Sequence, residues 1–225
     1  MENNKLLKLS YRFFWIVGYP GDVVVTATYS LPSSSSLKLE MEAEAKDKAT
    51  PINLAQHTYC NLAGHNSGKT LNHLILIWAS QITLVDENSI PTGELMSVEG
   101  TPFDSSTEKT IGKRFHEVPG GYDHNCVLDL GEEISGLKRA AKVKDPSSSR
   151  VLDLWTDAPG VQFYTANYVD GVVGKGGGAV YGKQSGLLLE TRGFPNAINE
   201  PKFLSVVVQP GQKYHYNMVF EFPTE

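Results

Sequence analysis

Two segments far apart in the chain carry the residue types that proton transfer requires. Residues 53–62 read NLAQHTYCNL and contain His57, and residues 188–195 read LLETRGFP and contain Glu190. A histidine and a glutamate are the usual pair when one group gives a proton and another takes it near neutral pH. Between them in sequence, residues 120–125 (GGYDHN) form a polar turn with the carboxylate of Asp123. These segments together indicate an acid, a base and a further carboxylate.

Other interpretations of the same residues are open at this point. Most histidines in proteins are hydrogen-bonded structural residues, and Glu190 is also suited to a solvated strand end. Asp123 fits an Asx turn that stabilises its own loop, and Gln162 fits a link between a strand and a loop. Asp123 and Glu190 together also suit a glycosidase, which uses two carboxylates. A metal site is not expected, because no two histidines have ligand spacing.

The bulk composition excludes several classes of protein. The 225 residues include 20 Lys and Arg against 25 Asp and Glu, a formal net charge of −5, without the basic runs that nucleic-acid binding requires. Cys60 and Cys126 are too few for a disulfide framework. Charges at Lys8 and Arg12 interrupt the apolar start of the chain, and no segment reaches the ~20 apolar residues of a membrane helix. We therefore expect a cytoplasmic protein with neither a nucleic-acid nor a membrane partner.

The chain has the pattern of an all-β protein. Short runs rich in Val, Ile, Thr, Tyr and Phe alternate with clusters of Gly, Pro, Asn and Ser. Residues 23–29 and 37–43 predict a hairpin with one solvated face, because the second run alternates apolar and polar residues. Polar turns are expected at 64–68, 145–149, 174–178 and 209–211. Further strands are predicted at residues 74–79, 151–156, 161–165 and 214–220.

Several motifs in a fixed order resemble the aldose 1-epimerase family, also called galactose mutarotases. The resemblance runs from about Gly18 to Phe222, and it includes the segments around His57, Asp123, Gln162 and Glu190. It also includes three supporting motifs, GYPGD, IPTGE and GTPFD, at residues 18–22, 90–94 and 100–104. The resemblance implies a large antiparallel β-sandwich over residues 18–225, with the site in a cleft on a sheet face and a divergent segment over residues 1–17.

The resemblance also implies an activity and a role for each site residue. Family members interconvert the α and β anomers of aldohexoses such as glucose and galactose by opening and closing the sugar ring, without a cofactor or a metal. His57 takes the position of the proton-donating histidine and Glu190 that of the base. Tyr59, Asp123 and Gln162 take the positions of substrate-binding residues. The implied partner is a small aldose, and the implied state is a monomer or weak dimer.

The sequence departs from the family pattern most strongly before Gly18. Members carry roughly a hundred further residues there, which supply an Asn-Arg pair and a second histidine, and this chain has seventeen residues in their place. The alternative expectation is therefore a truncated scaffold with weak or no catalysis, acting as a carbohydrate-binding or interaction module. Smaller departures are Cys60, Arg192 and Asn196. Arg192 lies two residues after Glu190 on the predicted strand, where it is expected to lower the proton affinity of the base.

Overall fold

Most of the regular secondary structure of the computed structural model is antiparallel β-strand, which confirms the all-β prediction. It describes residues 5–14, 18–129, 131, 133–175 and 178–223. Of the segment predicted to be divergent, residues 1–4 and 15–17 lie outside the described residues, as do residues 176 and 177 of the predicted turn at 174–178. No helix in the described part of the chain is long and apolar enough to cross a membrane.

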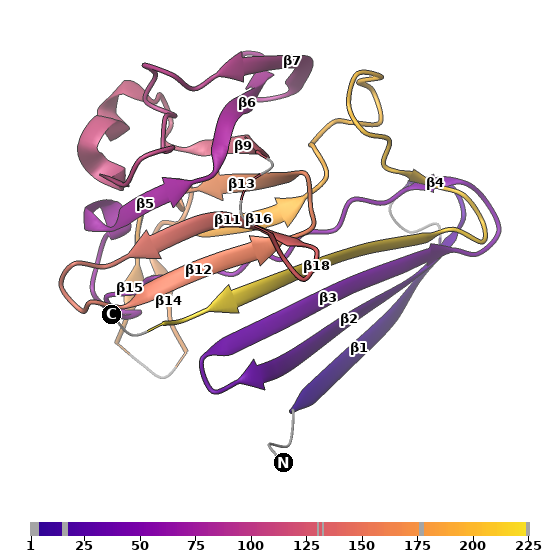
Figure 1. Cartoon of the computed structure of the whole chain (residues 1–225), viewed down its shortest axis with the longest axis horizontal. Coiled ribbons are helices and arrows are strands. Elements are labelled where there is room, and N and C mark those ends of the chain that lie inside the picture. The colour runs from indigo at the N-terminus through magenta and orange to yellow at the C-terminus, as the bar shows by residue number, and fades with distance from the viewer. Residues whose placement is uncertain (1–4, 15–17, 130, 132, 176–177, 224–225) are drawn as a thin grey trace.

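The larger sheet has nine strands in the order β1-β2-β3-β18-β12-β11-β5-β8, with β10 paired to β11 (Figure 1). The predicted hairpin is formed by β2 and β3, and the strand predicted at 151–156 matches β12. The bounds of the nine strands are Leu6–Phe14 (β1), Asp22–Ser33 (β2), Ser36–Ala45 (β3), Lys213–Glu221 (β18), Val151–Thr156 (β12), Leu137–Lys144 (β11), Leu74–Ile77 (β5), Lys109–Thr110 (β8) and Glu133–Ile134 (β10).

The smaller sheet has five strands in the order β16-β13-β9-β6-β7. Their bounds are Leu188–Arg192 (β16), Gly160–Tyr164 (β13), Asp123–Leu128 (β9), Ala79–Val85 (β6) and Pro91–Ser97 (β7). Short elements complete the description: the strand pairs Val172–Val173 (β14) with Val180–Tyr181 (β15) and Thr50–Pro51 (β4) with Val207–Val208 (β17), and the 3-10 helices Thr70–Asn72 (η1) and Ile111–Glu117 (η2).

The two sheets pack face to face around one apolar core. Met41, Val143 and Leu154 of the larger sheet belong to the same buried cluster as Val161 and Phe163 of the smaller one. Burial of these side chains is the main favourable term, because each removes apolar surface from water. The arrangement is the β-sandwich that the resemblance implied.

The single strand predicted at residues 74–79 is divided between the two sheets. The Trp78 amide donates to the Ala140 carbonyl in the larger sheet, while the Trp78 carbonyl accepts from the Asp129 amide beside the smaller sheet. The guanidinium of Arg139 also lies over the Trp78 indole, with the Arg139 Cζ atom 4.7 Å from the ring centroid. The chain therefore passes from the larger to the smaller sheet at Trp78 within one continuous apolar run. This change depends on pairing with strands that are distant in the sequence.

Strand β1 was not predicted and forms one edge of the larger sheet (Figure 1). Leu7 and Leu9 pair in register with Tyr29 and Ala27 of β2. These four residues share the face that carries the core farther along the sheet, because directly opposed residues in an antiparallel pair point the same way. Leu7 and Leu9 remain 56% and 53% exposed, so the core thins out toward this edge.

The packing predicts a large difference between two leucine truncations. Leu154→Ala removes a side chain with 0% exposure between the sheets, whereas Leu95→Ala alters a side chain that is 40% exposed on the outer strand β7. We expect a loss of about 2–5 kcal/mol in the free energy of unfolding for the first variant and less than about 1 kcal/mol for the second, measured by urea denaturation. Equal losses would contradict the face-to-face packing described here.

Candidate active site

The register of β9, β13 and β16 brings three of the predicted site residues to one sheet face. Gln162 of β13 lies opposite Glu190 of β16 and, on its other side, opposite Asn125 of β9. Tyr164 lies opposite Asp123 in the same way. Directly opposed residues point to the same face, so all five side chains belong to one side of the sheet. The alternate residues of these strands, including Val161, Phe163 and Leu189, point into the core.

The segment that carries His57 is held along β16 by hydrogen bonds outside the regular sheet. Asn53 donates from its side-chain amide to the Gly193 carbonyl and accepts from the Gly193 amide, each at 3.0 Å. Gln56 donates to the Leu189 carbonyl at 3.2 Å. Cys60 forms an isolated antiparallel bridge with Leu187. The segment therefore runs antiparallel to β16 and places His57 beside Glu190.

His57 and Glu190 form the closest acid and base pair of the site. The His57 Nε2 atom lies 3.5 Å from Glu190 Oε1, and the side chains are 56% and 8% exposed respectively. Burial raises the pKa of the Glu190 carboxyl group above its ordinary value, and the charge of Asp123 adds to that rise, whereas the charges of Arg192 and His57 lower the pKa. The net shift of the Glu190 pKa is upward, so the effect of burial outweighs the opposing effects of Arg192 and His57.

Arg192 occupies the position expected from its spacing. Its guanidinium Nη1 lies 3.9 Å from Glu190 Oε2, and its Nε is buried without a hydrogen-bond partner among the described residues. The guanidinium lowers the proton affinity of Glu190, in the direction predicted from the sequence. It therefore limits how far burial can raise the pKa of the base.

Asp123 and Gln162 are joined to each other. Gln162 Nε2 donates to Asp123 Oδ1 at 2.8 Å, which fixes both side chains at the middle of the sheet face. Gln162 Oε1 and both side-chain polar atoms of Asn125 are buried without a hydrogen-bond partner in the described part of the chain. Buried polar atoms normally have a hydrogen-bond partner, so these three atoms are exceptions on this face.

Aromatic rings surround the histidine, and one of them was not predicted. The predicted residue Tyr59 is 49% exposed, and its ring centroid lies 5.2 Å from that of His57. The Tyr164 ring centroid lies 6.4 Å from that of His57, and the Tyr164 ring stacks on that of Tyr168. The sequence did contain a signal for Tyr164, because it lies two residues after Gln162 on a strand and must share its face.

The arrangement suits proton transfer to and from a polar ligand. A weakly solvated carboxylate stands beside an accessible imidazole, and a second carboxylate, an amide and aromatic rings lie on the same face. Within the described residues, no group of three or more His, Cys, Asp or Glu side chains is placed to hold a metal ion. All five residues predicted for the site, His57, Tyr59, Asp123, Gln162 and Glu190, are brought to this region of the smaller sheet.

Comparison with known proteins identifies the family of the chain. The family model described as aldose 1-epimerase matches residues 13–221. Galactose mutarotase of Homo sapiens is 41% identical over 206 residues, which cover 91% of this chain and 59% of that protein. Aldose 1-epimerase of Escherichia coli K12 is 32% identical over 215 residues, which cover 92% of this chain and 61% of that protein. The chain therefore belongs to the aldose 1-epimerase family, and it spans about three fifths of the length of these relatives.

Solved structures show the same fold. A GalM/aldose epimerase homologue from C. elegans superposes with a TM-score of 0.86 at 25% identity, covering 97% of this chain and 66% of that one. A galactose 1-epimerase from Lactobacillus acidophilus gives a TM-score of 0.82 at 23% identity, covering 99% of this chain and 64% of that one. The second likeness supports the fold alone.

The ion pair beside the base predicts a change in its titration. In Arg192→Gln the pKa of Glu190 should rise, because the variant removes a cation that stabilises the carboxylate. The measurement is a carboxyl-carbon NMR titration of Glu190 in the wild type and the variant. Arg114→Gln serves as the control, because Arg114 pairs with Glu117 instead. An unchanged or lower pKa of Glu190 in Arg192→Gln would show that burial and the other charges alone determine it.

Proposed function

We propose that this chain interconverts the α and β anomers of aldohexoses such as glucose and galactose. The observation that supports the proposal most directly is the His57 imidazole placed 3.5 Å from a carboxylate whose pKa burial raises. The ring oxygen and the anomeric hydroxyl of an aldose are bonded to the same carbon, so the acid and base that serve them have to lie close together. The family membership of the chain supports the same reaction.

The proposed chemistry uses one proton at each of two oxygen atoms. Glu190 takes the proton from the anomeric hydroxyl while protonated His57 gives a proton to the ring oxygen. The bond between the anomeric carbon and the ring oxygen breaks, and its electron pair stays with that oxygen, which leaves an open-chain aldehyde. Rotation of the aldehyde and closure on its other face, with the two proton transfers reversed, give the other anomer. Atoms and charge balance without a cofactor.

The remaining residues of the face are proposed to position the sugar. Asp123 accepts hydrogen bonds from sugar hydroxyls, and Gln162 holds the Asp123 carboxylate through the 2.8 Å hydrogen bond. Tyr59 and Tyr164 provide apolar ring faces near His57, suited to the C–H faces of a sugar. We place Arg192 as a positioning residue whose charge lowers the pKa of Glu190 against the effect of burial.

A second candidate function is a carbohydrate-binding module with weak or no turnover. The observation that favours it is the 56% exposure of the His57 side chain, which leaves the proposed acid open to water in the described structure. Water weakens electrostatic interactions in a site, and its exclusion is a common contribution to catalysis. Both candidate functions predict sugar binding, but only the first predicts turnover. Measurements of both properties on one set of variants therefore distinguish them.

Removal of either proton-transfer group should abolish the acceleration. We expect Glu190→Gln and His57→Asn to lower kcat at least about a hundredfold while sugar binding persists. Polarimetry of freshly dissolved α-D-glucose and α-D-galactose measures the rate above the spontaneous one. Glu117→Gln and His215→Asn are the matched controls, because both side chains lie outside the site face. Turnover retained in either site variant would refute the assignment, and sugar binding without turnover by the wild type would establish the second candidate.

The proposed hydroxyl contact should affect binding more than chemistry. Asp123→Asn replaces a charged acceptor with a neutral one, so KM for D-galactose should rise about tenfold with a smaller change in kcat. Initial polarimetric rates over a range of sugar concentrations separate the two parameters. Asp86→Asn is the control, because Asp86 caps an exposed turn through an oxygen that an amide also offers. A wild-type KM in Asp123→Asn would exclude the contact.

A further inference from the structure

A cavity of about 530 Å³ adjoins the site and has no part in the proposed proton transfers. Its wall includes Tyr59, Val169, Val172 and Tyr181. Tyr59 is common to both regions, since its ring also lies 5.2 Å from that of His57. The volume is in the usual range for small-molecule sites, about 300–1,000 Å³. A ligand held beside His57 therefore has a neighbouring space into which a substituent can extend.

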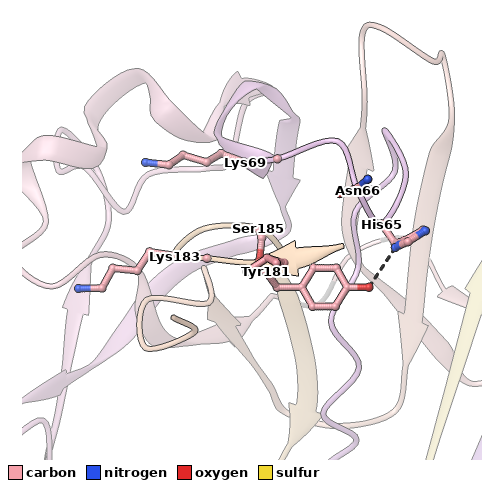
Figure 2. A pocket seen from close by; sticks show the side chains of 9 residues that line it. His65, Asn66, Lys69, Tyr181, Lys183 and Ser185 are labelled. Atoms are coloured by element: carbon pink, nitrogen blue, oxygen red, sulfur yellow. Dashed lines mark hydrogen bonds between the residues drawn. The ribbon is translucent and has the colours of Figure 1, made fainter. Parts of the chain in front are cut away.

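The polar groups around this cavity are largely engaged with one another. The Asn61 amide donates to the Gly68 and Ser185 carbonyls and accepts from Ala63 and Ser67, which uses its full capacity. His65 Nδ1 is hydrogen-bonded to the Tyr181 hydroxyl at 3.0 Å, as Figure 2 shows. A second sugar ring in this cavity would lose water from several hydroxyls, and the Asn61 amide has no hydrogen-bonding capacity left to replace it. An apolar group would incur no such loss.

Figure 2 shows side chains that line a different cavity, of about 420 Å³. His65 and Tyr181 line both cavities. Lys69 and Lys183 belong only to the second one, and their ammonium groups point away from the hydrogen-bonded pair. The charged side chains are thus kept apart from the cavity that adjoins Tyr59, which leaves its wall mainly aromatic and aliphatic.

The β14–β15 hairpin supplies the aliphatic side of the wall. Val172 pairs in register with Tyr181, and Val173 pairs with Val180. Opposed residues share a face and successive residues alternate, so Val172 and Tyr181 face the cavity and Val173 faces away from it. Val172 is 52% exposed, a large apolar surface left in contact with water beside a concave site. An apolar ligand group would cover it.

We propose that this cavity binds an aromatic or branched aliphatic substituent carried by the aldose on an oxygen other than the anomeric one. The preferred substrates are then sugar ethers or esters with a free anomeric centre, and the unsubstituted hexose is only the minimal substrate. This inference rests on the proposed function, because it assumes that the sugar ring lies beside His57 and Glu190. The cavity wall then determines specificity without taking part in the proton transfers.

The test compares sugars that differ only in their substituent. The probes are D-glucose, its monobenzyl ethers at O2, O3, O4 and O6, and the disaccharides maltose and cellobiose. At least one ether should have a KM about tenfold lower than that of D-glucose, as expected for burial of an aromatic ring. Val172→Asp should remove most of this gain, and Val173→Asp should retain it, while both variants turn over D-glucose like the wild type. The pair is matched in residue type, strand and added charge.

The outcomes separate this inference from the proposed function. Turnover of D-glucose with no gain for any ether would overturn the inference alone. A gain for maltose or cellobiose that exceeds that of every ether and disappears in Val172→Asp would overturn it in favour of a second sugar ring. Failure to accelerate any sugar would overturn the proposed function. In that case, calorimetric dissociation constants of the ethers and of D-glucose would test substituent binding in the cavity without turnover. Tighter binding of an ether than of D-glucose that is lost in Val172→Asp would support the inference, and equal binding would overturn it.

Discussion

The structure around the site depends on the register between β9, β13 and β16. Val161 and Phe163 must face the larger sheet for the sandwich to bury its core, so Gln162 and Tyr164 have to face away from it. A slip of one residue would exchange the two sets and place a glutamine and a glutamate in the core. The burial of apolar side chains on one face thus determines which polar groups meet on the other, and packing and site geometry are enforced by the same hydrogen-bond ladder.

Within that constraint, the properties of Glu190 arise from its position in the sheet. It lies in the edge strand β16 of the smaller sheet, yet the segment from Asn53 to Cys60 covers that edge through bonds to Gly193, Leu189 and Leu187. This cover removes water from the carboxylate and brings His57 to it at the same time. One segment therefore supplies both the burial of Glu190 and the neighbouring imidazole, while Arg192 on the same strand face opposes the rise in pKa.

The sequence located β2, β3, β12, β13 and β18, because period-two alternation and turn residues are local signals, whereas β7, β9 and β11 were not predicted. Residues 151–156 and 214–220 were located closely for this reason, whereas the run at 74–79 was wrongly joined, because the exchange of sheets at Trp78 depends on Ala140 and Asp129 far away in the chain. Strand β1 was missed, although Leu7, Leu9 and Tyr11 alternate with Lys8, Ser10 and Arg12 at the period of a strand. The candidate site residues were chosen through family motifs. The place of Tyr164 two residues after Gln162 was a local signal that was overlooked, whereas the cover over β16 emerged only from the three-dimensional arrangement.

The difference between the two neighbouring regions lies in how their hydrogen bonds are satisfied. On the sheet face, Gln162 Oε1 and the side chain of Asn125 are without partners among the described residues, and Asp123 is exposed. Beyond Tyr59, Asn61 and His65 are engaged by their own surroundings. In the two proposals, the sheet face holds the sugar ring through Asp123, and the cavity beyond Tyr59 holds an apolar substituent, which loses no hydrogen bonds there. Tyr59 belongs to both regions, because its ring lies 5.2 Å from that of His57 and also lines the cavity.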